Sequence, residues 1–299
     1  MIQRLAHPVS SDPHRGPVLE FGGLDVLWIQ VGGTLCNIAC THCFISCGPK
    51  NDSHPMMRRD EVQALLERAE TLGVKEYYFT GGEPFLHDEI EALIADVLRQ
   101  GPLSILTNAL LIDDARASRL AWMAESSPFG LDLRVSIDGM DATENDPIRG
   151  RGSFDKILAG ARHLNDHGLN PVFTVTTVHA KYAASRGRGE FMQHLRHLGF
   201  ERPRVKFIPP FRIGREERRD EAYCDEHRLG PQDLLAGGEN ALQCGSCRAV
   251  TARGVYPCPI LIEEDGARMG AALEEGLRPI ALNHPACKSC HQEGFSCRT

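Results

Sequence analysis

Three cysteines lie close together in one short loop, Cys36-Asn-Ile-Ala-Cys40-Thr-His42-Cys43, directly after the apolar run from Leu24 to Val31. Soft sulfur ligands at such short spacing select iron-sulfur clusters, zinc or copper. A set of three thiolates leaves one site of a four-iron cluster, or of a zinc ion, without a protein ligand. Two hypotheses follow: a zinc site that His42 completes, or an iron-sulfur cluster whose open site binds another molecule.

Strand and helix patterns alternate after the first apolar run, which β-branched and aromatic residues fill and glycines close. Repeated strand-helix units imply a parallel sheet with right-handed crossovers. Loops that bind ligands then gather at the carboxyl ends of the strands. The six predicted strands cover 24–31, 74–80, 103–107, 131–137, 171–178 and 205–208, and the predicted helices cover 59–72, 87–99, 113–124, 153–167 and 189–198.

A second motif, Gly81-Gly82-Glu83-Pro84, follows the second predicted strand. Glycines that close a strand indicate by themselves only a tight loop. Together with the cysteine loop, however, this stretch resembles the signature pair of the radical S-adenosylmethionine (SAM) superfamily. The resemblance implies that Cys36, Cys40 and Cys43 bind a 4Fe-4S cluster and that SAM fills its open site. It also implies that His42 lies near the adenine and that the GGEP stretch receives the SAM amino group.

Three further stretches resemble motifs of the same superfamily. Thr107-Asn108-Ala109 resembles its TNG motif and departs from it at Ala109, Ser136-Ile-Asp-Gly139 resembles its SIDG motif, and Asp146-Pro-Ile-Arg149-Gly150 resembles its D-x-x-RG motif. The resemblance implies that Asn108, Ser136 and Arg149 bind the cofactor, the last two through the ribose or carboxylate of SAM. Taken one by one, Asn108 and Asp138 are also typical turn residues, and Arg149 is compatible with a surface charge beside a helix.

The resemblance implies an α/β fold, a partial (β/α)6 radical SAM barrel with a small cysteine-rich C-terminal auxiliary-cluster domain. We predict an irregular lead-in over residues 1–23, the barrel over 24–213 and the auxiliary domain over 214–299. The chain of 299 residues has room for about two domains on a length prior.

A second group of cysteines follows residue 240, and it contains two Cys-x2-Cys pairs that begin 43 residues apart: Cys244, Cys247, Cys258, Cys287, Cys290 and Cys297. Such pairs are a strong metal signal, and spacing alone leaves a zinc ribbon open. The stretch Arg253-Gly-Val-Tyr-Pro-Cys258-Pro and the later cysteines resemble the SPASM or twitch extension of radical SAM enzymes. The first three cysteines also resemble the cluster site of the cyclases that begin molybdopterin synthesis. These resemblances imply one or two auxiliary 4Fe-4S clusters.

Two cysteines remain outside these groups. Cys47 lies four residues after Cys43 and could be a fourth ligand only by displacing SAM, so a loop thiol is favoured. For Cys224, an ordinary thiol is favoured over a ligand of a second cluster or a residue that acts on substrate.

Composition and charge exclude several classes of protein. The chain is 42% hydrophobic and 24% charged, as soluble domains are, and has neither an apolar run for a membrane span nor an export leader. We therefore expect a cytoplasmic protein without a membrane partner. A formal net charge of −7 does not favour binding to nucleic acid, which is itself negatively charged. The basic group Arg212, Arg215, Arg218 and Arg219 alternates with Glu216 and Glu217, which is typical of a solvated helix face.

The resemblance also implies a reaction, in which a reduced cluster cleaves SAM and the resulting 5′-deoxyadenosyl radical takes a hydrogen atom from a substrate. An auxiliary cluster would then aid oxidation or bind substrate, and flavodoxin or ferredoxin would supply electrons. We favour a small metabolite over a peptide, because too few residues precede Leu24 for a domain that grips a leader peptide. The alternatives are a radical SAM peptide maturase and a non-catalytic zinc or iron-sulfur interaction protein. No catalytic acid or base can be assigned from the sequence.

Overall fold

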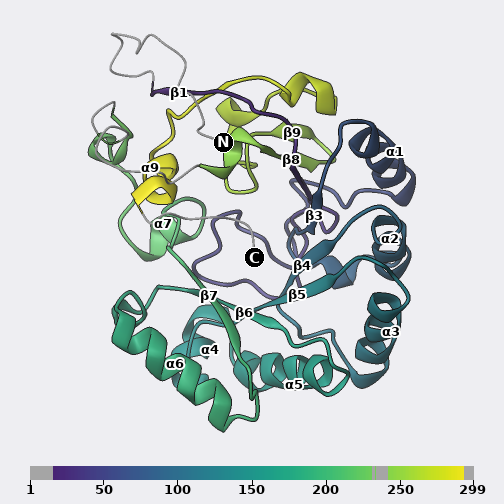
Figure 1. Ribbon diagram of the computed structural model, residues 1–299. Helices are drawn as coiled ribbons and strands as arrows, with labels where there is room; N and C mark the ends of the chain where they lie inside the picture. The colour runs from purple at the N-terminus through teal and green to yellow at the C-terminus, as the bar shows by residue number, and fades with distance from the viewer. Residues whose placement is uncertain (1–15, 231–232, 234–241, 293–299) are drawn as a thin grey trace.

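A computed structural model of the chain describes residues 16–230, 233 and 242–292. Its centre is an eight-stranded sheet in the order β7-β6-β5-β4-β3-β2-β8-β9 (Figure 1). The strands are β2 (Val26–Ile29), β3 (Glu76–Phe79), β4 (Leu103–Thr107), β5 (Leu131–Ser136), β6 (Val172–Thr176), β7 (Arg204–Ile208), β8 (Cys247–Thr251) and β9 (Gly254–Tyr256).

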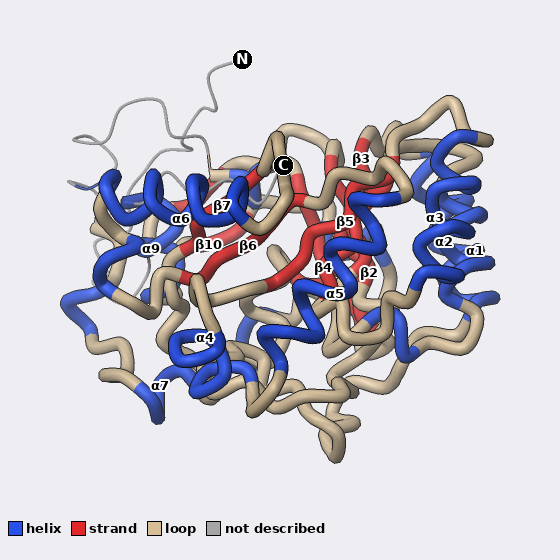
Figure 2. The backbone as a smooth tube through the Cα atoms, turned by 90° about the horizontal axis from the view of Figure 1, so that it is seen from below, coloured by secondary structure: helices blue, strands red, loops and turns tan. Residues whose placement is uncertain are grey.

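Strands β2 to β7 pair in parallel with their neighbours, so the predicted α/β fold and all six predicted strands are confirmed. Helices follow the strands and pack on the outside of the curved sheet, as Figures 1 and 2 show. They are α1 (Arg59–Thr71), α2 (Ile90–Val97), α3 (Asp114–Glu125), α5 (Ser153–Asp166) and α6 (Ser185–His197). Helix α4 (Ala142–Arg149) follows β5 beyond its carboxyl end and packs against α5.

Alternation along each strand gives the sheet two different faces. In β2, Leu27 and Ile29 belong to the large hydrophobic core that the outer helices cover. Val26 and Trp28 point to the other face, where they pack in a smaller cluster that includes Cys36. Trp28 stacks on Tyr78 of β3, with ring centroids 4.2 Å apart. The inner face therefore forms the wall behind the first cysteine loop.

The C-terminal part of the chain continues the main sheet. Strand β8 pairs in parallel with β2, and β9 pairs antiparallel with β8. Val250 and Val255 are buried in the same core as the strands of the barrel. A separate two-stranded pair joins β1 (Val18–Leu19) to β10 (Ile280–Ala281), and helix α9 (Pro285–Gln292) follows. The domain boundary between residues 213 and 214 stays a prediction.

Two local features differ from the expected pattern. Helix α4 was not predicted, because Pro147 lies inside it and short polar residues fill its first turn. Asp141 caps this helix by accepting hydrogen bonds from the backbone amides of Thr143 and Glu144. Helix α6 begins at Ser185, four residues before the predicted start at Gly189, although two glycines lie in its first turns. Within the described ranges, no helix combines the length and apolar character that a membrane span requires.

Candidate active site

A cavity opens at the carboxyl ends of the strands, where both signature motifs meet. It is also lined by apolar side chains from the cysteine loop and from the segment after β7, including Phe44 and Phe211. Among the residues predicted to bind the cluster or SAM, those that line this cavity are Cys36, Cys40, His42, Cys43, Gly81, Gly82, Asn108, Ser136 and Arg149.

The cysteine loop is held by backbone hydrogen bonds. The amide of Cys36 donates to the carbonyl of Gly48, 3.2 Å away, and the amide of Cys43 donates to Cys40 at 3.3 Å. These hydrogen bonds fix the path of the loop, and its three thiols line one cavity. Three thiolate donors of this kind fit a 4Fe-4S cluster with one open iron site.

The two glycines of the second motif permit a close approach to this loop. Gly82 donates its amide to the carbonyl of Gly33 at 2.9 Å, and a Cβ atom on Gly82 would lie 2.0 Å from the carbonyl oxygen of Leu35. Gly81 has φ +140° and packs against Gly32. Glycine is required at both positions, because a Cβ atom on Gly82 would meet the backbone of Leu35 and Cys36 and one on Gly81 would meet the backbone of Gly32.

Glu83 and Pro84 are buried behind the cavity wall. The Glu83 carboxylate accepts hydrogen bonds from Thr107 Oγ1 at 2.7 Å and from the amide of Asn108 at 2.8 Å. Burial raises the pKa of this carboxyl, against the effect of these hydrogen bonds. Glu83 thus joins the end of β3 to the end of β4 and fixes the position of Asn108.

Asn108 contacts the cysteine loop directly. Its Nδ2 atom donates to Asn37 Oδ1 at 2.7 Å and lies 3.7 Å from Cys36 Sγ. The next residue, Ala109, has φ +60°, the left-handed conformation that glycine adopts without strain. The departure from the TNG motif therefore falls on a position where glycine would fit the backbone better.

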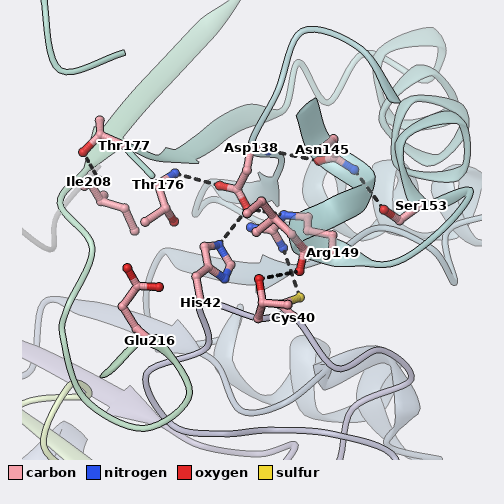
Figure 3. A network of polar contacts seen from close by, with 12 residues as sticks. Cys40, His42, Asp138, Asn145, Arg149, Ser153, Thr176, Thr177, Ile208 and Glu216 are labelled. Carbon is pink, nitrogen blue, oxygen red and sulfur yellow. Dashed lines mark hydrogen bonds and ion pairs between the residues drawn. The ribbon is translucent and has the colours of Figure 1, made fainter. Parts of the chain in front are cut away.

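A buried ion pair links the cysteine loop to helix α4 (Figure 3). Asp138 is fully buried, and its Oδ2 atom lies 2.7 Å from His42 Nε2 and 2.7 Å from Arg149 Nε. Burial alone would raise the pKa of the Asp138 carboxyl, but the charge of Arg149 and the contact with His42 hold it well below its usual range. Arg149 Nη1 also lies 3.9 Å from Cys40 Sγ. Arg149 is therefore an interior residue rather than a surface charge.

Arg215 clamps the cysteine loop from the other side. Its guanidinium donates to the carbonyls of Cys40 at 2.7 Å and Ser46 at 2.9 Å, and also to that of Cys47. Its backbone amide donates to Cys43. This contact depends on Gly214, which has φ +63° and where a Cβ atom would lie 2.3 Å from the carbonyl oxygen of Phe44.

The sequence interpretation of this basic segment as a solvated helix face is wrong for two of its residues. Arg215 binds the cysteine loop, and Glu216 is fully buried and accepts hydrogen bonds from Arg219. Helix α7 covers only Glu216–Arg219, with Glu217 and Arg218 exposed as expected. The only local signal for Arg215 is its place after a glycine that follows the last barrel strand.

The thiols of the cysteine loop have different environments. Burial raises the pKa of Cys36 to about 12 and that of Cys40 to about 11. A hydrogen bond from the Cys47 thiol lowers the pKa of Cys43 to about 6, against the effect of burial. Because thiolates are the metal ligands, binding a cluster would displace the protons of the first two thiols. Cys47 thus behaves as a hydrogen-bonding loop thiol beside Cys43.

The second group of cysteines lines another cavity, between η4 (Gln243–Gly245), the β8–β9 hairpin and α9. Five of the six predicted ligands line it, namely Cys244, Cys247, Cys258, Cys287 and Cys290. Cys297 lies outside the described residues. Cys224 is exposed, with its sulfur 3.2 Å from His227 Nδ1. The structure therefore brings both Cys-x2-Cys pairs to one place.

Arg248, which follows Cys247 in β8, is fully buried. Its guanidinium donates to the carbonyls of Cys244 at 2.7 Å, Cys247, Gly276 and Arg278, and it stacks over the ring of Phe21. Burial lowers the pKa of this guanidinium, and the nearby cysteine sulfurs favour its charge. No local pattern predicts the role of this residue, since one arginine in a short strand is unremarkable.

The sequence profile of the Radical SAM superfamily matches residues 31–182, just over half of the chain. The chain belongs to the radical SAM superfamily. A radical SAM enzyme of this kind carries a 4Fe-4S cluster and uses SAM. The family match confirms the recognition made from the two signature motifs.

Several proteins share sequence with this chain. The GTP 3′,8-cyclase of Mycobacterium sp. (strain KMS) is 31% identical over 179 residues, which cover 57% of this chain and 49% of that protein. The GTP 3′,8-cyclase 2 of Mycobacterium tuberculosis (strain ATCC 25618 / H37Rv) is 31% identical over 191 residues, which cover 62% of this chain and 50% of that protein. The chain thus matches about half the length of these relatives.

Solved structures share the fold at lower identity. Native anSMEcpe with bound AdoMet and a peptide superposes with a TM-score of 0.62 at 19% identity, covering 84% of this chain and 79% of that chain. Streptococcus suis SuiB bound to its precursor peptide SuiA has a TM-score of 0.56 at 16% identity, covering 84% of this chain and 62% of that chain. These likenesses confirm the predicted partial barrel.

Proposed function

We propose that this radical SAM enzyme cleaves SAM at a 4Fe-4S cluster held by Cys36, Cys40 and Cys43 and acts on a small molecule. The observation that carries the proposal is that these three thiols and the Gly81-Gly82 backbone line the same cavity. A zinc scaffold has no need of a glycine pair beside its thiols. The non-catalytic alternative is therefore set aside.

The cluster, when bound and reduced, supplies the electron that breaks SAM into methionine and a 5′-deoxyadenosyl radical, which then takes a hydrogen atom from the substrate. The chain's own residues position the reactants and exclude water. The backbone of Gly81 and Gly82, which lies beside the cysteine loop, would bind the SAM amino group. Ser136 and Arg149, which line the same cavity, would bind the ribose or carboxylate of SAM. His42, whose Nε2 atom lies 2.7 Å from Asp138 Oδ2, would lie near the adenine.

Around the cluster, this chain supplies contacts that fix the ligands. Asn108 lies against Cys36, Arg149 against Cys40, and the Cys47 thiol against Cys43. Hydrogen bonds to cluster sulfurs and solvent exposure tune the potential of iron-sulfur sites. Each ligand thus has one partner that would hold its sulfur in place.

We propose that the second cavity holds at least one auxiliary 4Fe-4S cluster, which would aid oxidation of the substrate or bind it. Five buried or half-buried cysteines in one cavity exceed the four thiolates that a single cluster uses. The buried guanidinium of Arg248, which donates to the carbonyls of Cys244 and Cys247, would offset the negative charge of such a site. Electrons for the first cluster would come from a flavodoxin or a ferredoxin.

The proposed substrate is a small metabolite, with a peptide as the alternative. The relatives that share sequence are named for a reaction on GTP, and both superposed structures contain peptides, but the latter share only the fold. Sequence similarity at 31% identity carries more weight than a shared fold at 19%. The relatives' substrate itself is not proposed for this chain.

The test is turnover under anaerobic conditions with SAM and a reductant. Reconstituted protein is incubated with polar metabolites or with peptides encoded beside the gene, and 5′-deoxyadenosine is quantified by mass spectrometry. We expect a metabolite to raise 5′-deoxyadenosine release above the basal rate and to change in mass. SAM-dependent binding of a peptide, followed by a change in its mass on turnover, would overturn the small-molecule proposal.

A further inference from the structure

A buried carboxamide faces the second cysteine cavity. Gln243 directly precedes Cys244, lines the cavity with the five cysteines and is 9% exposed. Both polar atoms of its side chain, Nε2 and Oε1, are buried, and neither has a hydrogen-bond partner among the residues that the structure describes. The other described side chains that line this cavity are cysteines and aliphatic residues.

A carboxamide in this state is costly. A buried polar group without a hydrogen bond loses the hydration that it has in the unfolded chain, and native structures contain few such groups. Leu242 and Leu282 line the same cavity, and an aliphatic side chain like theirs at position 243 would avoid this cost. The position of Gln243 is therefore explained best by an occupant of the cavity that pairs with an amide.

The donor set of the cavity identifies that occupant. Thiolates and cluster sulfides are acceptors only, so a 4Fe-4S cluster offers many acceptors to an N–H donor. The five cysteines already provide more thiolates than one cluster requires, so an amide oxygen is not needed as an iron ligand. What the cavity lacks on this side is a donor to the sulfurs, and the Gln243 amide is one.

We infer that Gln243 is a positioning residue of the auxiliary site, whose side-chain N–H donates a hydrogen bond to a sulfur of the auxiliary cluster and thereby favours its reduced form. The inference rests on the auxiliary cluster proposed above. A donor near the sulfurs stabilises the added electron, as hydrogen bonds to cluster sulfurs do in general. Together with the buried charge of Arg248, it would set the potential at which this cluster exchanges electrons.

The experiment measures the potential of the auxiliary cluster alone. In the full-length chain, Cys36, Cys40 and Cys43 are replaced by alanine so that only an auxiliary cluster can form, and the reduced cluster is followed by electron paramagnetic resonance during a redox titration. Gln243→Leu keeps the volume and removes the donor, and Gln243→Glu keeps the shape and exchanges the donor for a carboxyl. Gln63→Leu, on helix α1 and away from the cavity, is the matched control.

We expect Gln243→Leu to lower the ratio of reduced to oxidised cluster about tenfold at a fixed potential, which is the effect of losing one hydrogen bond. Gln243→Glu should lower it at least as far, and Gln63→Leu should leave it unchanged. If Gln243→Leu binds as much iron as the background variant and its cluster keeps the same midpoint potential, the role of Gln243 is overturned, while the proposed auxiliary cluster still stands. If the variant that lacks Cys36, Cys40 and Cys43 shows neither bound iron nor a cluster signal, the proposal of an auxiliary cluster is wrong, and the inference about Gln243 fails with it.

Discussion

The Nε atom of Arg215 donates a hydrogen bond of 2.7 Å to the carbonyl oxygen of Cys40, which lies 175 residues earlier in the chain. The contact joins the segment after the last barrel strand to the loop that we propose holds the SAM-cleaving cluster. Arg215 therefore couples the end of the barrel to the position of the cluster ligands.

Replacing Arg215 with methionine should loosen the first cluster while leaving the fold intact. The change removes the guanidinium donor that joins the carbonyls of Cys40, Ser46 and Cys47, so the ligand loop gains freedom. We expect roughly tenfold faster loss of iron to a chelator, as for other residues that orient metal ligands. Arg218→Met, at an exposed position of α7, is the control, and equal iron loss in both variants would contradict the clamp.

Replacing Asp138 with asparagine should destabilise the protein strongly. The change leaves the buried guanidinium of Arg149 without its carboxylate, at a cost of about 3 kcal/mol in the free energy of unfolding. Asp132→Asn breaks the half-exposed pair with Arg204 and should cost less than about 1 kcal/mol. Denaturant unfolding under anaerobic conditions compares the two, and similar losses would argue against a buried ion pair.

The contribution of Asp138 to the free energy of unfolding should also decrease as the pH falls. Its pKa is lower in the folded state than in the unfolded state, so its stabilisation is complete above the unfolded value near pH 4 and is lost as the pH falls through the folded value. The difference in unfolding free energy between wild type and Asp138→Asn should stay constant from about pH 7 to about pH 5 and shrink below about pH 4. A difference that grew on acidification would have the wrong sign.

Replacing Gly82 with alanine should abolish most SAM cleavage. The new Cβ atom would lie 2.0 Å from the carbonyl oxygen of Leu35, so the motif and the cysteine loop must move apart. A displacement of about 1 Å in an active site costs about 100-fold in rate, and we expect that loss in 5′-deoxyadenosine formation. Gly130→Ala, where a Cβ atom meets nothing within 4 Å, is the control. Wild-type cleavage by Gly82→Ala would show that the close approach is dispensable.

Replacing Ala109 with glycine should be tolerated. Glycine relieves about 1 kcal/mol of strain at φ +60° but adds a similar entropy to the unfolded chain. We expect a net change within about 0.5 kcal/mol of zero in the free energy of unfolding. The same change at Ala117, inside helix α3, should cost about 1 kcal/mol or more. Equal losses at both positions would contradict the strained conformation of Ala109.

The strands and most helices were predictable because their signals are local. Apolar periodicity marks β2 to β7, and the two signature motifs lie where those strands end. Helix α4 was missed because Pro147 argues locally against a helix, whereas Asp141 and Gly150 cap it at its two ends. Boundaries moved by a few residues for the same reason, since capping depends on contacts as well as on sequence.

The remaining site residues depend on contacts between distant segments, which no local pattern encodes. Arg215 and Glu216 have the composition of an exposed helix, and only the folded chain brings Arg215 to the cysteine loop. Arg248 reaches the carbonyls of Gly276 and Arg278 only in the folded chain, since these lie 28 and 30 residues further along the sequence. Asp138 was visible within a motif, but its ion pair with Arg149 required the position of α4.

The most direct test of the central claim is 5′-deoxyadenosine formation by a variant in which Cys36, Cys40 and Cys43 are all replaced by alanine. Wild type and variant are reconstituted anaerobically with iron and sulfide, reduced, and given SAM, with bound iron measured in each. The account predicts no 5′-deoxyadenosine above background from the variant, while some iron stays bound at the second cysteine cavity. Wild-type formation of 5′-deoxyadenosine by the variant would contradict the account.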